Sequence, residues 1–260
     1  MNPEEYTKLD RIDRDHWFYQ GKRKIVRYWI DRYITLHPDD LYIDAGCGTG
    51  TMLLEMSKAC HVLGLDDHQE STTIARPKVE PVGGHVLQTN MIDVPLKDGC
   101  AAVVTLLDVL EHIDDHKAAL QEAIRLVRPG GLIVITVPAM KILWSDWDVA
   151  LRHRRRYTRD ELIALVDGPE TELLRCTYFN TALLPAIMAV RLWRKLRPSL
   201  NGKTRAEDRI PAAPINRLLM SLMTKPATWP WFQTPIGVSL LAVLRRTHVA
   251  SDRSTLEITP

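Results

Sequence analysis

The amino-acid sequence predicts an α/β protein with a central, mostly parallel β-sheet and helices on both faces. Between residues 41 and 139, short runs suited to strands alternate with helical patterns, which is the rhythm of βαβ units. The runs at 102–107 and 132–137 are almost entirely apolar, as expected of strands buried on both faces. Apolar residues make up 45% and charged residues 25% of the 260 residues, the composition of a globular protein with a sizeable core.

Each element has its own signal along the chain. A helix over 115–127 carries apolar residues at i, i+3 and i+4 and should stop at 128–131, where proline and two glycines disfavour helix. Thr158 is the expected N-cap of a later helix, which a strand at 173–178 should follow. A closing edge strand is predicted at 237–244. The parallel strands are expected at 41–45, 61–65, 85–88, 102–107 and 132–137.

Residues 180–235 interrupt this rhythm. They contain seven prolines and two short apolar helical patterns around a polar linker at 201–209. We therefore expect an α-helical cap inserted at 180–235, on a core formed by residues 1–179 and 236–250. The pattern at 181–197 has an apolar face and a basic end, which suits a lid over a pocket and, alternatively, peripheral contact with an anionic membrane.

Composition excludes some classes of protein. With 34 basic and 32 acidic side chains, net charge does not indicate a nucleic-acid partner, and none is expected. The four cysteines form no CxxC pair, which favours a reducing, cytoplasmic compartment. The first 15 residues do not resemble a signal peptide, and the apolar runs are shorter than the about 18–20 residues that span a bilayer. Composition leaves the oligomeric state open.

Residues 44–50, which read DAGCGTG, follow directly from the first strand. Glycines at alternate positions let the backbone turn tightly and approach a ligand closely. The dinucleotide fingerprint GxGxxG needs glycine or alanine at position 51, where Thr51 stands, so a nicotinamide-dependent oxidoreductase is disfavoured.

This loop and the motifs after it resemble class I S-adenosylmethionine-dependent methyltransferases over residues 6–179, among them bacterial small-molecule and glycan methyltransferases. The resemblance implies a Rossmann-like methyltransferase fold and S-adenosyl-L-methionine as cofactor, with S-adenosyl-L-homocysteine as product. It assigns the ribose to the acid after the second strand, the adenine to the segment after the third, and the methyl group to the segment after the fourth. The cofactor-binding residues so implied are Asp44, Gly46, Cys47, Gly48, Gly50, Asp66, Asp67, Asn90, Met91, Ile92, Asp93 and Asp108.

Two histidines are placed to act on an acceptor. His112 follows the fourth strand, and His153 lies in the loop after the fifth. An imidazole near its ordinary pKa can remove a proton from a hydroxyl. We predict that one of them is the catalytic base and rank His153 first. If the acceptor is already a good nucleophile, alignment alone suffices.

The loop at 144–157 is rich in tryptophan, arginine and histidine. It should lie at the carboxyl edge of the sheet, where open α/β proteins bind ligands. The alternative for this loop is a solvated basic turn that Arg156 and Tyr157 hold against the core. Trp17, in the N-terminal segment, is predicted to contact a ligand, and the alternative is that it packs on the edge of the sheet. The predicted acceptor-binding residues are Trp144, Trp147, Arg154, Arg156, Tyr157 and Trp17.

The sequence therefore predicts methyl transfer from S-adenosylmethionine to a hydroxyl of a small molecule. A saccharide or lipid-linked glycan is the preferred acceptor, and glycan or secondary-metabolite biosynthesis the expected setting. A natural-product phenol or amine stays open, as does a nucleic-acid-modifying protein that uses the arginine cluster. No metal is expected, because Asp108, Asp114 and Asp115 lack the spacing of a magnesium site.

Overall fold

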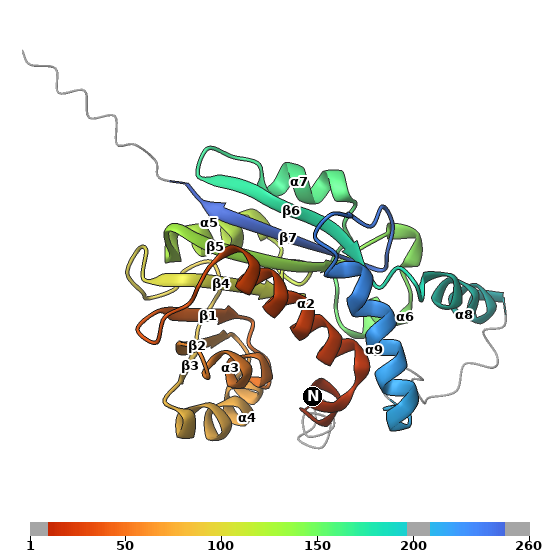
Figure 1. The fold of residues 1–260 in the computed structure, drawn as a ribbon, viewed down its shortest axis with the longest axis horizontal. Helices are drawn as coiled ribbons and strands as arrows, with labels where there is room; N and C mark the ends of the chain where they lie inside the picture. The colour runs from red at the N-terminus through yellow and green to blue at the C-terminus, as the bar shows by residue number, and fades with distance from the viewer. Residues whose placement is uncertain (1–9, 197–208, 248–260) are drawn as a thin grey trace, which may run out of the picture.

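The computed structural model describes residues 10–196 and 209–247. Its strands form one seven-stranded sheet in the order β3-β2-β1-β4-β5-β7-β6 (Figure 1). Five consecutive strands pair in parallel and β7 runs antiparallel to both of its neighbours, which confirms the predicted mostly parallel sheet. The strands are β1 (Leu41–Ala45), β2 (His61–Asp66), β3 (His85–Gln88), β4 (Ala101–Leu107), β5 (Val127–Pro138), β6 (Thr171–Phe179) and β7 (Ser239–Arg246).

Helices cover both faces of the sheet (Figure 1). One buried cluster joins α5 and α7 to the sheet, and a second joins α2, α3, α4 and α9 to the other face. Short helices η1 (Glu80–Val82), η2 (Lys141–Leu143) and α6 (Asp146–Ala150) lie in loops. The other helices are α2 (Trp17–Tyr33), α3 (Thr51–Met56), α4 (Gln69–Val79), α5 (His116–Leu126), α7 (Arg159–Val166), α8 (Leu184–Leu196) and α9 (Ala213–Ala227).

Two helices begin where local capping chemistry dictates. Asp115 accepts a hydrogen bond from the backbone N–H of Ala118 and caps α5. Thr158 caps α7, and Glu161 returns a hydrogen bond to the Thr158 backbone, which completes a capping box. The predicted start of both helices is confirmed.

Two strand predictions are wrong. Residues 237–244 do not form an edge strand: β7 lies between β5 and β6 and pairs with both. Its first six residues, from Ser239, are all buried, which an internal position explains. The fifth strand begins at Val127, five residues before the predicted start at 132. Residues 128–131 belong to this strand and do not form a separate turn, and its pairing with β4 shifts register there.

The region predicted as a cap contains α8 and α9, and α9 packs along α2. The Asn216 side chain accepts a hydrogen bond from the Trp17 backbone at 2.8 Å, and the Trp29 indole donates one to the Ala227 carbonyl at 3.0 Å. Most of the 201–209 linker lies outside the described residues, and the division into core and cap stays a prediction. No helix in the described ranges is long and apolar enough to cross a membrane.

Candidate active site

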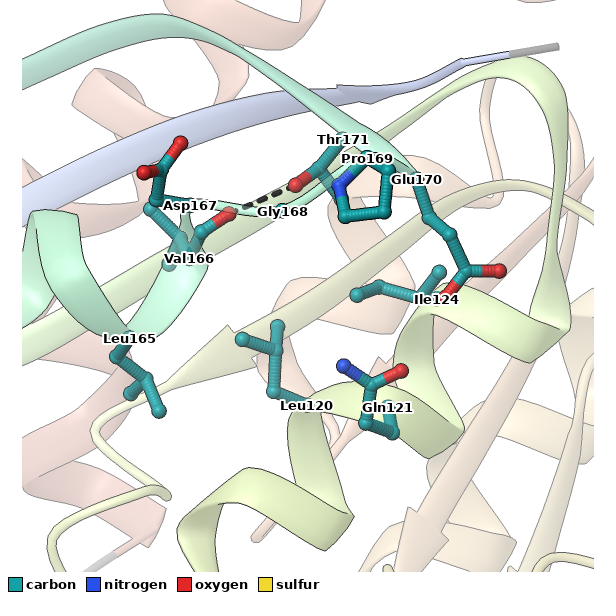
Figure 2. Close-up of a pocket in the computed structure, with 10 residues that line it drawn as sticks. All are labelled: Leu120, Gln121, Ile124, Leu165, Val166, Asp167, Gly168, Pro169, Glu170 and Thr171. Carbon is teal, nitrogen blue, oxygen red and sulfur yellow. Dashed lines mark hydrogen bonds between the residues drawn. The ribbon is translucent and has the colours of Figure 1, made fainter. Parts of the chain in front are cut away.

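The predicted site residues meet at the carboxyl edge of the parallel strands. The loops after β1, β2, β4 and β5 all leave the sheet at this edge. A small pocket drawn in Figure 2 lies at the opposite end of the strands, where β6 starts beside the end of β7. The hydroxyl of Thr171 donates a hydrogen bond to the carbonyl of Val166 there. That pocket is therefore separate from the predicted site.

The loop after β1 is shaped by its glycines. Gly48 has φ +53, and apart from its own chain neighbours nothing lies within 4 Å of where its Cβ would be, so its backbone is open to a ligand. A Cβ on Gly46 would lie 2.4 Å from the Val109 side chain, so this glycine lets the loops after β1 and β4 touch. Cys47 is buried, and burial raises the pKa of its thiol, so it contributes packing rather than a thiolate.

Asp66 lies beside this loop at the end of β2. Its Oδ2 accepts from the Gly48 backbone N–H at 2.9 Å, and its Oδ1 accepts from the His68 N–H at 3.0 Å. Burial raises its pKa, although these two hydrogen bonds oppose the shift. Asp67 points to solvent and contacts the His68 ring. The open Gly48 backbone and the neighbouring Asp66 carboxylate together offer hydrogen-bond donors and acceptors, which suits a polar ligand that carries hydroxyl groups.

Asp44 is 3% exposed and accepts a hydrogen bond from the Thr105 hydroxyl at 2.6 Å. Burial raises its pKa to about 7, while the bond from Thr105 and the charge of Lys22 act in the opposite direction. The structure thus places Asp44 beneath the glycine loop rather than on an open surface.

The segment after β3 continues the edge beside Asp66, because the Thr89 N–H donates to the Asp66 carbonyl. Asn90 is exposed and its side chain accepts from the Ile92 N–H at 3.1 Å. Met91 is buried, whereas Ile92 and Asp93 are exposed. The predicted adenine segment therefore presents Asn90, Ile92 and Asp93 at the surface of this edge.

Asp108 directly follows β4 and has φ 56, in the left-handed region. Its carboxylate accepts from Lys22 Nζ at 2.8 Å and from the Thr136 hydroxyl at 2.9 Å. Burial opposes ionisation, but the Lys22 charge and these hydrogen bonds outweigh it, so the pKa of Asp108 is lowered. Lys22 also lies over the Tyr19 ring, 5.2 Å from its centroid. Lys22 is not among the predicted site residues.

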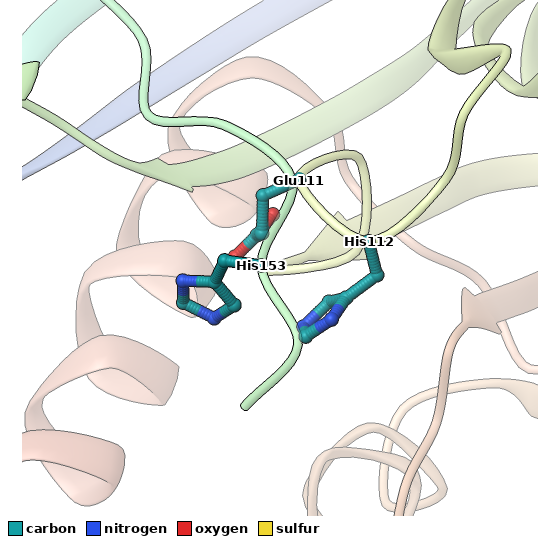
Figure 3. Close-up of side chains that lie close together, drawn as sticks. All are labelled: Glu111, His112 and His153. Atoms are coloured by element: carbon teal, nitrogen blue, oxygen red, sulfur yellow. The ribbon is translucent and has the colours of Figure 1, made fainter. Parts of the chain in front are cut away.

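Three ionisable side chains converge in the loops after β4 and β5. Figure 3 shows Glu111, His112 and His153 pointing toward one another. The two imidazole rings meet edge to face, with centroids 4.8 Å apart. Glu111 is fully buried, and neither carboxylate oxygen has a hydrogen-bond partner. Burial and the nearby Asp108 charge raise its pKa well above the ordinary value, and burial lowers that of His112 to about 4.

Asp148 holds His153 in place. Its Oδ1 lies 3.0 Å from His153 Nδ1 and 2.7 Å from Arg156 Nε, and its Oδ2 accepts from the Ser145 N–H and hydroxyl. Burial favours the neutral acid, but the bonds from His153 and Arg156 prevail and lower the pKa of Asp148. With Nδ1 directed at this carboxylate, the free lone pair of a neutral His153 is on Nε2. Sequence reasoning did not single out Asp148 or Glu111.

The predicted acceptor residues separate into two groups. Trp144 is 42% exposed, and Arg154 is a half-exposed residue that pairs with Asp114, so both lie on open surface. Arg156 and Tyr157 are 5% and 2% exposed and bond to Asp148 and His116, so they hold the loop to the core, and their contact with an acceptor stays a prediction.

The two remaining residues are tryptophans. Trp17 is half-buried and packs against the core cluster under α2, as the edge-packing alternative expects. The side chain of Trp147 lies outside the described part of the chain.

Part of the chain is similar to a known family of proteins. The family model described as "Methyltransferase domain" matches residues 43–135. An uncharacterized 37.1 kDa protein in transposon TN4556 of Streptomyces fradiae is 35% identical over 60% of the chain and 45% of its own length. A Probable S-adenosylmethionine-dependent methyltransferase of Mycobacterium tuberculosis is 30% identical over 60% of both proteins. The ubiquinone biosynthesis O-methyltransferase of Photobacterium profundum is 26% identical over 64% of the chain and 81% of its own length. The chain thus spans about half the length of the first two.

Solved structures share the fold. The geranyl diphosphate C-methyltransferase of Streptomyces coelicolor, in complex with Mg²⁺, geranyl diphosphate and S-adenosyl-L-homocysteine, has a TM-score of 0.58 at 14% identity and covers 85% of this chain and 78% of its own. The YcgJ protein of Bacillus subtilis has a TM-score of 0.56 at 15% identity and covers 86% of this chain and 98% of its own.

Proposed function

Residues 43–135 form a methyltransferase domain with the class I fold, and from this we propose that the protein is an S-adenosylmethionine-dependent methyltransferase acting on a small-molecule hydroxyl. A saccharide or lipid-linked glycan is the preferred acceptor. The observation that carries the hydroxyl assignment is the Asp148–His153 pair beside His112, because an imidazole oriented by a carboxylate can accept a hydroxyl proton.

The chain's own residues suit the cofactor. The open backbone at Gly48 and the neighbouring Asp66 carboxylate would hold the ribose side, and residues 90–93 the adenine side. Lys22 and Asp108 carry opposite charges, as the carboxylate and ammonium of a methionine group do. When bound, S-adenosylmethionine supplies a methyl group activated by a sulfonium leaving group. The protein then has to orient the acceptor oxygen and help it lose its proton.

At the acceptor end, His153 is the first candidate for proton removal and His112 the second. His153 is the better oriented of the two, since Asp148 fixes one of its ring nitrogens. Trp144 and Arg154 are exposed beside this cluster and would contact the acceptor. Trp147 belongs to the same proposed surface by its place in the sequence.

Other acceptors stay open. The ubiquinone biosynthesis enzyme among the relatives is by name an O-methyltransferase, which fits a hydroxyl acceptor, whereas the geranyl diphosphate enzyme is by name a C-methyltransferase. A natural-product phenol or amine therefore stays an alternative acceptor. An amine acceptor would need no base. A nucleic-acid substrate is disfavoured, because two of the five arginines at 152–159, Arg154 and Arg156, already pair with carboxylates.

We also propose a cytoplasmic enzyme that touches membranes peripherally through residues 181–197. Met188 and Val190 of α8 are 41% and 47% exposed, which suits contact with an apolar surface. The acceptor would then be lipid-linked, and the setting glycan or secondary-metabolite biosynthesis.

The deciding experiment is a set of parallel calorimetric titrations of the purified protein with S-adenosylmethionine, S-adenosylhomocysteine, NADH and RNA. We expect saturable binding of S-adenosylmethionine and of S-adenosylhomocysteine only. Binding of NADH, or RNA binding with a steep salt dependence, would contradict the proposed function.

A further inference from the structure

A buried carboxyl group without a hydrogen-bond partner is costly in either protonation state, and Glu111 is such a group. It is fully buried, and neither oxygen has a hydrogen-bond partner. Buried charged groups in folded proteins are normally paired or bind a metal ion. Glu111 points toward His112 and His153, and the three side chains can offer one ligand atom each within 4.8 Å of one another (Figure 3).

The surroundings of this cluster resemble the outer layer of a metal site. A histidine that binds a metal ordinarily donates its other ring N–H to a carboxylate, which fixes the ring. Asp148 occupies that position on His153 Nδ1, and Arg156 and Ser145 hold Asp148 in turn. The Arg154 N–H donates to the Glu111 carbonyl at 2.8 Å, which ties the two contributing loops together.

We propose that Glu111, His112 and His153 bind one divalent transition-metal ion. Two imidazole nitrogens and one carboxylate oxygen suit Mn²⁺, Fe²⁺ or Zn²⁺ better than Mg²⁺, which prefers oxygen ligands. Bonds of about 2.0–2.2 Å to one ion bring ligand atoms to within about 4 Å of one another, so a small side-chain rotation closes the site. The sequence interpretation expected no metal, but it weighed only Asp108, Asp114 and Asp115.

The role of the ion rests on the proposed function, with one change: a His153 whose Nε2 binds the ion does not accept the hydroxyl proton, so the ion takes over that part of the reaction. A hydroxyl that lies against a divalent cation loses its proton more readily, because the cation stabilises the developing negative charge. The C–O bond then forms as the methyl–sulfur bond breaks, and the hydroxyl proton leaves to solvent. The products are a methyl ether, S-adenosylhomocysteine and one proton.

The test is metal titration of the full-length protein after EDTA treatment and gel filtration. We expect calorimetry and electron paramagnetic resonance to give one Mn²⁺ per chain, with Zn²⁺ competing for it. Glu111→Gln and His112→Gln should each weaken Mn²⁺ binding by at least about 10–100-fold, since that range is typical even when only an outer partner of a metal ligand is removed. His85→Gln is the matched control, because His85 is an exposed histidine of β3 outside the cluster.

Thermal unfolding separates a ligand from a structural residue. In metal-free protein, Glu111→Gln removes only an unpartnered buried carboxyl, so the Tm should hold or rise. Mn²⁺ should raise the Tm of the wild type and of His85→Gln, but not of Glu111→Gln.

Two results would overturn the metal site. One is no binding of Mn²⁺ or Zn²⁺ at concentrations up to about 1 mM, the weak end of specific affinity. The other is wild-type affinity in both Glu111→Gln and His112→Gln, which would move the ion to the Asp66, Asp67 and His68 group. S-adenosylmethionine is titrated alongside: if it binds and Mn²⁺ does not, the metal site alone fails and the proposed function stands.

Discussion

Lys22 of α2 donates a hydrogen bond at 2.8 Å to Asp108, which directly follows β4 and lies 86 residues further along the chain. The Lys22 and Asp108 side chains are 10% and 26% exposed, so the pair is shielded from water. It fastens the N-terminal helix over the edge of the sheet, beside the glycine loop. Helix α2, which precedes the residues matched by the family model, is thereby part of the candidate site.

Replacing Lys22 by Met should lower the free energy of unfolding by about 1–3 kcal/mol, because Asp108 would keep its charge without its partner. Urea unfolding measures this. The double variant Lys22→Met/Asp108→Asn should recover part of the loss, since no uncompensated charge remains. Additive losses in the double variant would mean that the two residues are not coupled.

Asp66→Ala should weaken S-adenosylmethionine binding by about 1.5–3 kcal/mol, the scale of a hydrogen bond to a charged group. Calorimetry on the folded variant checks this. Asp39→Ala, at an exposed aspartate before β1, is the control and should bind as the wild type does. Unchanged affinity in Asp66→Ala would remove the ribose assignment.

Asp44 should make stability depend on pH. Its pKa is about 7 in the folded protein and about 4 in an unfolded chain. Between these values the folded state keeps a proton that the unfolded state has lost, so the free energy of unfolding should fall as pH rises from about 4 to about 7.

Asp44→Asn removes this contribution and preserves the acceptor for Thr105. The variant should therefore gain stability over the wild type as pH rises, by on the order of a few kcal/mol at pH 8. Chemical unfolding at pH 5 and pH 8 measures the difference. A constant difference between the two proteins at both pH values would contradict the shift.

Asp148→Asn should lower kcat by about 10–100-fold, because the amide no longer holds His153 with a charged acceptor. Affinity for S-adenosylmethionine should stay near that of the wild type, which distinguishes positioning of His153 from damage to the cofactor side. Asp98→Asn, at an exposed aspartate paired with Arg125, is the matched control. Equal kcat in wild type and Asp148→Asn would show that the orientation of His153 is unimportant.

His153→Ala should lower kcat by about 10²–10⁴ and leave cofactor affinity nearly intact. His112→Ala should cost less, because no carboxylate fixes its ring as Asp148 fixes that of His153. Methyl transfer measured at saturating S-adenosylmethionine compares them. A larger loss in His112→Ala would reverse the ranking.

Local sequence patterns determined most of the fold. Apolar runs gave the strands, Asp115 and Thr158 gave the starts of two helices, and alternate glycines marked the loop after β1. These features depend on neighbours within a few residues, through turn geometry, capping and periodicity, so they can be read without the fold. The placement of Asp66 beside the glycine loop followed from the order of parallel strands.

Tertiary structure alone decided which side chains meet. Glu111 and His112 face His153 only because the loops after β4 and β5 pack together, and Arg156 and Tyr157 turn inward because Asp148 and His116 receive them. Likewise, β7 lies inside the sheet because β6 pairs with its other side and forms the outer strand. Long-range pairing and burial depend on which surfaces come together and lose water, and no local pattern of residues encodes that contact.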